Sequence, residues 1–105
     1  MKKPIPFNVE KEPSVANGTS LRGYISTTYD FLVEKFGEPR KLNCDKVNVE
    51  WTLKYEDGTV ATIYDWKTNS VPKDLYRWHV GGKGIDVLGH IEATLGIPAS
   101  HSLFL

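Results

Sequence analysis

The sequence predicts an α+β fold, a two-layer sandwich in which two helices cover one face of a three-stranded antiparallel sheet. Three observations support this class. The stretch Lys46 to Lys67 alternates apolar and polar residues around Asp57-Gly58, a pair typical of two-residue hairpin turns. Residues 27–36 and 85–95 each place apolar side chains on one helical stripe. A half-apolar sheet and two half-apolar helices bury each other in two layers.

The hairpin sets the expected register. A type I′ turn, with Asp57 and Gly58 both at positive φ, makes Tyr55 face Val60 and Trp51 face Tyr64. Side chains alternate with period two, so one face is expected to be apolar and aromatic. Its members are Val49, Trp51, Leu53, Tyr55, Val60, Tyr64 and Trp66. The opposite face carries Glu50, Lys54, Glu56, Thr59, Ala61, Ile63, Asp65 and Lys67.

The third strand is expected at residues 76–80, paired antiparallel with the second arm of the hairpin. Its alternation places Trp78 on the apolar face and both Arg77 and His79 on the polar face. The three tryptophans of the chain are therefore expected to form one cluster between sheet and helices.

Both helices carry start and stop signals. Thr27 and Asp30 have the spacing of a capping box before the first helix, which Gly37 and Pro39 end. The second helix is expected from Ile85 to Leu95, followed by a glycine and a proline in the same arrangement. Its apolar stripe consists of Ile85, Leu88, Ile91 and Leu95.

The remaining segments are read as connections and ends of a single domain spanning residues 1–105. Residues 1–17 form an extended arm or a short N-terminal edge strand, and residues 18–25 a short strand or an ordered turn. The glycines at 81, 82 and 84 suit a strand-to-helix turn. The apolar tail, residues 99–105, either docks on the domain or stays exposed.

Composition limits the classes of function. Thirteen basic and thirteen acidic side chains give a formal charge of zero, which excludes a strong field for duplex DNA and a charge mimic of DNA. The single cysteine, Cys44, allows no internal disulfide and suits a reducing compartment. No apolar run is long enough for a membrane span. These features indicate a cytoplasmic protein without a membrane partner.

The candidate chemical motifs are weak. Glu50 and Asp65 face each other in the predicted register, as a carboxylate pair for a cation or for acid–base chemistry, but two ligands are too few for a metal site. Lys54, Lys67 or Arg77 can neutralise them. The three histidines and Cys44 lack metal-ligand spacing, and the glycines near residue 82 lack the pattern of a P-loop. We expect neither an enzyme nor a bound metal or cofactor.

The polar sheet face is the expected partner-binding surface. Ile63 lies there as an apolar residue among charges, and arginines are common anchors of protein interfaces. The proposed contact residues are Arg22, Glu50, Lys54, Ile63, Asp65, Arg77 and His79, together with the loop Gly18 to Tyr24. The tail Leu103-Phe104-Leu105 is the alternative contact. Binding of a single-stranded nucleic acid is the alternative function, supported only by Arg22, Lys54, Lys67, Arg77 and Lys83. It is disfavoured because the predicted register puts the aromatic rings on the covered face. The basic residues are also interleaved with Glu50, Glu56 and Asp65.

Between Gly18 and Leu95 the chain resembles a family of small uncharacterised proteins encoded by tailed bacteriophages and prophages. The resemblance lies in the order of four blocks: GTSLRGYI, YDFLVEKFGEP, KVNVEWTLKYEDGTVATIYDWK and YRWHVGG. It implies expression in the host cytoplasm and no catalytic residues. It also implies a protein that binds and inhibits a host or phage protein complex, such as an anti-defence (anti-CRISPR-like) inhibitor.

Overall fold

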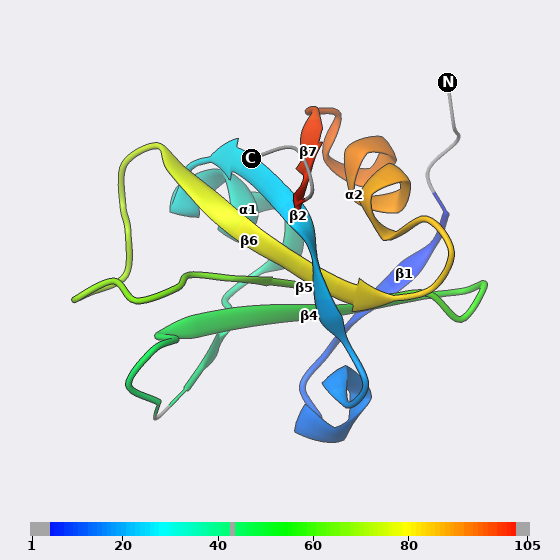
Figure 1. The fold of residues 1–105 in the computed structure, drawn as a ribbon, viewed down its shortest axis with the longest axis horizontal. Coiled ribbons are helices and arrows are strands. Elements are labelled where there is room, and N and C mark those ends of the chain that lie inside the picture. The colour runs from blue at the N-terminus through cyan, green and yellow to red at the C-terminus, as the bar shows by residue number, and fades with distance from the viewer. Residues whose placement is uncertain (1–4, 43, 103–105) are drawn as a thin grey trace.

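The computed structural model describes residues 5–42 and 44–102, and these form one antiparallel sheet with two α-helices (Figure 1). The sheet has seven strands in the order β1-β4-β5-β6-β2-β7, and β3 pairs with β4 beside this path. Figure 1 shows α1 and α2 on the upper side of the β4–β5 hairpin and a short 3-10 helix, η1, below it. Neither described helix is long and apolar enough to cross a bilayer.

Along the chain, four strands and α1 precede β5, and β6, α2 and β7 follow it. Their bounds are β1 Phe7–Glu10, η1 Pro13–Ala16, β2 Ser20–Thr27, α1 Tyr29–Phe36, β3 Arg40–Lys41, β4 Val49–Tyr55, β5 Val60–Tyr64, β6 Tyr76–Lys83, α2 Val87–Leu95 and β7 Ala99–His101.

The α+β class agrees with the sequence, but the three-stranded sheet is wrong. The hairpin and β6 form the expected centre, and β1, β2, β3 and β7 extend it. β1 is the N-terminal edge strand that the sequence left open as an alternative to an extended arm. The other added strands are short or interrupted by glycine, so local alternation does not reveal them. β2 even occupies an inner position between β6 and β7. Of the apolar tail, Ala99–His101 pairs with β2, and Leu103-Phe104-Leu105 lie outside the described residues.

The predicted hairpin register is wrong by one residue. Leu53 faces Ala61 and Trp51 faces Ile63, and the amide of Tyr55 donates to the carbonyl oxygen of Thr59 at 2.8 Å. The loop thus has three residues, 56–58, and only Gly58 among them has a positive φ, of 92°. This is the pattern of a turn closed by a glycine in a bulge position rather than a two-residue type I′ turn.

One additional loop residue reverses the face of every β5 side chain relative to β4. Ile63 is fully buried beside Trp51, whereas Trp66 is 38% exposed on the other face. Trp51 and Trp78 make an edge-to-face contact with ring centroids 5.6 Å apart, as expected. Trp66 is not part of that cluster, so the single cluster of three tryptophans is also wrong.

The helices cover the face that carries Trp51 and Trp78. In α1, Thr28 rather than Thr27 is the N-cap, and its hydroxyl accepts from the amide of Phe31 at 3.2 Å. In α2, Asp86 caps the helix, so Ile85 precedes it and is fully exposed instead of packing. The buried helix residues are Leu32 and Phe36 in α1, and Val87, His90, Ile91 and Leu95 in α2.

Gly23 allows the last strand to join the sheet. A Cβ at this position would lie 2.1 Å from the carbonyl oxygen of Ser100 and 2.9 Å from a methyl carbon of Leu88. Real Cβ atoms do not approach a backbone oxygen so closely, and a backbone atom cannot move aside as a side chain can. Only glycine at this point lets β7 and α2 pack against β2.

Replacing Gly58 by valine is expected to destabilise the protein by about 1–2 kcal/mol, because a β-branched residue resists positive φ. Nothing lies within 4 Å of a Cβ at this position, so the penalty is conformational and not steric. Urea unfolding measures it. Gly58→Asn is the control, since asparagine tolerates this region better, and an equal loss in both variants would contradict a conformational origin.

Candidate functional site

The corrected register gathers aromatic rings on the sheet face that α1 and α2 leave uncovered. Tyr64 of β5 and Tyr24 of β2 are both paired with His79 of β6. Trp66 lies two residues beyond Tyr64, just after the end of β5. We call these four residues the aromatic platform. The platform lies on and beside three neighbouring strands, β5, β6 and β2, with β6 in the middle (Figure 1). His79 of β6 is therefore its central residue.

His79 holds the platform together. Its ring stacks on Tyr64, with centroids 5.5 Å apart and an interplanar angle of 30°, and meets the edge or face of Tyr24 at 5.0 Å. The Trp66 ring is tilted against it at 6.1 Å. Tyr24 is buried and both Tyr64 and His79 are half-buried. Trp66 is consequently the ring that is open to a ligand.

Three cations surround these rings. The ammonium groups of Lys46 and Lys67 lie 5.7 and 5.8 Å from the centroid of Trp66, and the guanidinium carbon of Arg77 lies 3.9 Å from that of Tyr24. Such contacts are cation–π interactions. The amide of Lys67 donates to the carbonyl oxygen of Lys46 at 2.7 Å, which holds the two lysines on adjacent chain segments. We call Lys46, Lys67 and Arg77 the cationic rim.

The acidic residues nearest the platform do not cancel the rim. Glu50 forms an ion pair with Arg40, and Asp65 is buried and accepts hydrogen bonds from its own neighbours. Within residues 5–42 and 44–102, no carboxylate lies at ion-pair distance from Lys46, Lys67 or Arg77. The three rim cations therefore have no carboxylate partner in the described part of the chain, although the chain as a whole has no net charge.

His79 is an uncharged member of the platform at neutral pH. Burial lowers its pKa below the ordinary 6.5, and the neighbouring Arg77 guanidinium lowers it further, while Asp65 acts weakly in the opposite direction. Its buried Nδ1 has no hydrogen-bond partner. The ring therefore contributes stacking area to the platform rather than a fourth positive charge.

The predicted contact residues do not form one surface. Arg77 and His79 lie at the platform, and Glu50 lies beside it opposite Tyr64. The other four are elsewhere. Lys54 lies near the opposite end of the hairpin and Arg22 beside the start of α2, whereas Ile63 and Asp65 are fully buried on the core side.

Asp65 is a structural residue and not part of a carboxylate pair. Its Oδ1 accepts from the amides of Asn48 and Val49, and its Oδ2 from the side chains of Asn48 and Thr68 at 2.6 Å each. Burial raises its pKa, but these hydrogen bonds outweigh burial and leave the pKa below the ordinary 3.8. The predicted pairing with Glu50 is wrong because the shifted register points the two side chains to opposite faces.

Sequence reasoning assigned Tyr64 and Trp66 to the core, included Tyr24 only as the end of the loop Gly18 to Tyr24, and did not assign Lys46 to the site. The signal that could have found them is the apolar character of Ala61 and Ile63, which the predicted register left on a polar face. A three-residue loop buries both and exposes the two aromatic residues instead.

A second candidate is the pair Asp57–His90 at the hairpin tip, which lines a hollow of about 380 Å³. His90 Nε2 lies 2.8 Å from Asp57 Oδ2, and its Nδ1 lies 2.6 Å from the carbonyl oxygen of Asp86. With both nitrogens engaged inside the fold, the pair fastens the hairpin tip to α2 and leaves no free base for catalysis.

Asp57 makes this contact sensitive to acid. The hydrogen bond from His90, and then that from the amide of Thr59, lower the pKa of Asp57 to about 2 from its ordinary 3.8. As pH falls, Asp57 is therefore protonated in the unfolded state before it is protonated in the folded state. The contribution of the Asp57–His90 contact to stability is complete above about pH 4 and is lost towards pH 2. Thermal unfolding of Asp57→Asn is expected to vary less with pH over this window than that of the wild type; identical profiles would contradict the role.

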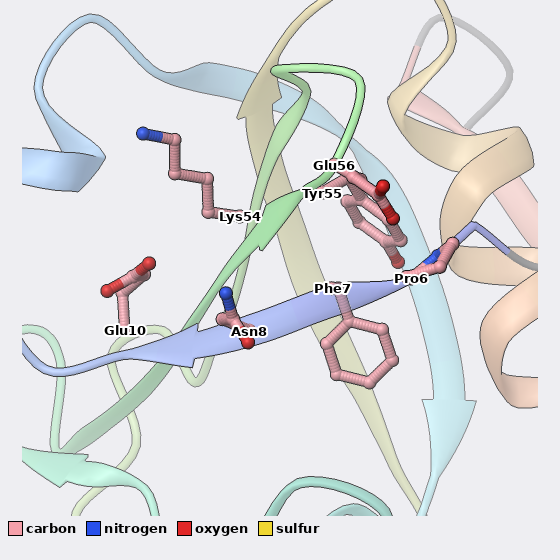
Figure 2. Close-up of a pocket in the computed structure, with 7 residues that line it drawn as sticks. All are labelled: Pro6, Phe7, Asn8, Glu10, Lys54, Tyr55 and Glu56. Carbon is pink, nitrogen blue, oxygen red and sulfur yellow. The ribbon is translucent and has the colours of Figure 1, made fainter.

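A hollow of about 430 Å³ lies along the edge strand β1 (Figure 2). Figure 2 shows Lys54, Asn8 and Glu10 projecting to one side of β1 and β4, and Phe7 to the other. The polar groups mix both charges and diverge from one another. This hollow offers no convergent set of side chains for a ligand.

A wider hollow of about 600 Å³ lies between α1 and the segments around residues 41–49 and 70–73. Its polar groups are already engaged. Tyr29 donates to Glu38 at 3.2 Å, and the ammonium of Lys73 lies 3.8 Å from the centre of the Tyr29 ring. In the described part of the chain, no group of three or more His, Cys, Asp or Glu side chains could hold a metal ion.

Comparison of the chain with protein-family models, with curated proteins and with solved structures finds no match. The resemblance to small phage proteins therefore rests on the four sequence blocks alone. The site with the strongest physical basis is the aromatic platform with its cationic rim.

Proposed function

We propose that the protein is a non-enzymatic binding protein that docks on a macromolecular partner through the aromatic platform. The observation that carries this proposal is the open ring of Trp66, 38% exposed and flanked by two lysines, on the sheet face opposite α1 and α2. Tryptophan and arginine are the residues most often found as anchors of binding surfaces. A large exposed ring costs solubility without adding much stability, which favours a binding role.

The chemistry of the other candidates supports a role without catalysis. Asp57 and His90 satisfy each other, and Asp65 is saturated by four hydrogen bonds from its neighbours. Cys44 is an exposed free cysteine. None of these groups combines an open position with an activating partner.

Two classes of partner fit a ring surrounded by cations: a protein with an acidic patch and a single-stranded nucleic acid. The resemblance to small phage proteins is the ground for the first class, a host protein complex in the host cytoplasm that the chain would inhibit. The platform itself is the ground for the second class, because the corrected register moves Tyr64 and Trp66 to the outer face of the sheet.

Affinity purification of the tagged protein from infected cells, followed by mass spectrometry, tests whether the platform mediates binding. The comparison uses three forms: the wild type, the double variant Trp66→Ala with Arg77→Glu, and Lys54→Glu. Lys54 lies on the same sheet at the far end of the hairpin, which makes it a matched charge-reversal control. Circular dichroism confirms that each form is folded.

Partners that the wild type and Lys54→Glu retain and the double variant loses are the expected result. If the double variant keeps every partner at full recovery, docking through the platform is wrong. The described surface around Ile85, or the tail that lies outside the described residues, then becomes the better candidate.

A further inference from the structure

We propose that the partner is a single-stranded nucleic acid whose base stacks on Trp66 while neighbouring phosphates contact Lys46, Lys67 and Arg77. This inference rests on the proposed function, since it names the partner of the same surface. It combines two independent features of the platform, an open aromatic ring and an uncompensated positive rim.

The first feature is a ring held ready for stacking. Trp66 packs against His79 at 6.1 Å and against Tyr64 at 6.4 Å, and its amide donates to the hydroxyl of Tyr76 at 3.1 Å. These contacts fix the position of the residue while leaving 38% of it exposed. Stacking of a base on an aromatic side chain does not depend on sequence, because every base has a π-face.

The second feature is charge complementarity. Lys46 and Lys67 lie within 6 Å of the Trp66 ring, so phosphates on either side of a stacked base fall within reach of an ammonium group. Arg77 extends the positive charge across the sheet to Tyr24. Glu50 is neutralised by Arg40, and buried Asp65 presents no free oxygen to the surface.

Single strands fit this surface better than duplex DNA or an acidic protein. The bases of a duplex are already stacked on each other. A chain with no net charge and three local cations also lacks the positive electrostatic field that duplex binding requires. An acidic protein patch would use the cations but leave the open ring without a specific role. Splayed bases on an open sheet face, by contrast, use both features together.

Binding can be measured with fluorescein-labelled oligothymidine and oligouridine of about 15 nucleotides, the size range of small single-strand sites. A duplex of the same length, heparin and polyglutamate serve as comparison probes. Tryptophan fluorescence gives a second readout. Trp51 and Trp78 are buried, so quenching by the oligonucleotide reports the environment of Trp66.

Trp66→Ala is expected to weaken binding of the single strands about tenfold or more, the usual loss when one stacking ring is removed. Trp66→Phe should retain most of the affinity while losing the fluorescence quenching. Binding of the wild type should fall with salt with a logarithmic slope of about −2, since each of three phosphate contacts contributes about −0.7. Arg77→Glu should weaken binding and reduce that slope, and Lys54→Glu should change neither.

Three other outcomes overturn the proposal. Heparin or polyglutamate bound as tightly as the single strands, without dependence on Trp66, would show charge attraction alone. No binding to either oligonucleotide, together with a purified protein partner that needs Trp66, would refute the nucleic acid and leave docking through the platform intact. If neither oligonucleotides nor purified partners depend on Trp66, both proposals fail.

Discussion

Replacing Trp51 by alanine is expected to lower the free energy of unfolding by roughly 3–5 kcal/mol, whereas Trp66→Ala should lower it by about 1 kcal/mol or less. Trp51 is 1% exposed, contacts Trp78, and donates from its ring nitrogen to the carbonyl oxygen of Gly37 at 2.8 Å. Its removal leaves a cavity under α1. Trp66 loses only surface contacts with Tyr64 and His79.

Urea unfolding followed by circular dichroism gives both values. Trp78→Ala serves as the control for the core, because Trp78 is fully buried and donates to the carbonyl oxygen of Thr27 at 3.1 Å. Equal losses of unfolding free energy in Trp51→Ala and Trp66→Ala would favour the two-residue turn. They would contradict the placement of the platform on the surface. This measurement therefore tests the fold and the candidate site together.

Asp65→Ala should destabilise the protein by on the order of 3–5 kcal/mol, since two buried backbone donors each cost roughly 1–3 kcal/mol when left unpaired. The amides of Asn48 and Val49 are those donors, at 2.8 and 3.2 Å from Oδ1. Thermal or urea unfolding measures the loss. Asp74→Ala, at an exposed position, is the matched control and should change stability little.

Asp65→Asn separates the hydrogen bonds from the charge. Asparagine keeps one acceptor for the two amides but turns an NH₂ group towards Asn48 and Thr68, so a smaller loss than with alanine is expected. Because the pKa of Asp65 is lowered in the folded state, the wild type should lose stability as pH falls below about 4. A metal-binding role would instead predict that added divalent cations stabilise the wild type and not these variants.

Local patterns predict a large part of this fold. Both helices end where their glycines and prolines indicate, and the hairpin and β6 occupy the centre of the sheet. β1 is the short N-terminal edge strand that the sequence offered as an alternative to an extended arm. The strands that were missed, β3 and β7, have two and three residues, too few for alternation to be distinguished from chance. β2 was left open between strand and turn because Gly23 interrupts its apolar pattern.

The candidate site was less predictable, because the face on which the β5 side chains lie depends on whether the hairpin loop has two or three residues. Arg77 and His79 were placed correctly on the outer face, because the alternation of side chains within β6 does not depend on the length of the hairpin loop. Tyr64 and Trp66 were placed on the wrong side, and Ile63 and Asp65 with them, because Asp57-Gly58 suits a two-residue turn as well as the three-residue turn that occurs.

The sequence by itself determined the α+β class, the positions of the helices and the existence of the hairpin. Each of these depends on interactions between residues close together in the chain, such as helix caps, turn residues and alternating side chains. The tertiary structure decided which hairpin face is covered, because burying Ile63 in the core beside Trp51 outweighs the local preference of the turn. The aromatic platform follows from that choice, since Tyr64 and Trp66 must then face outward beside His79.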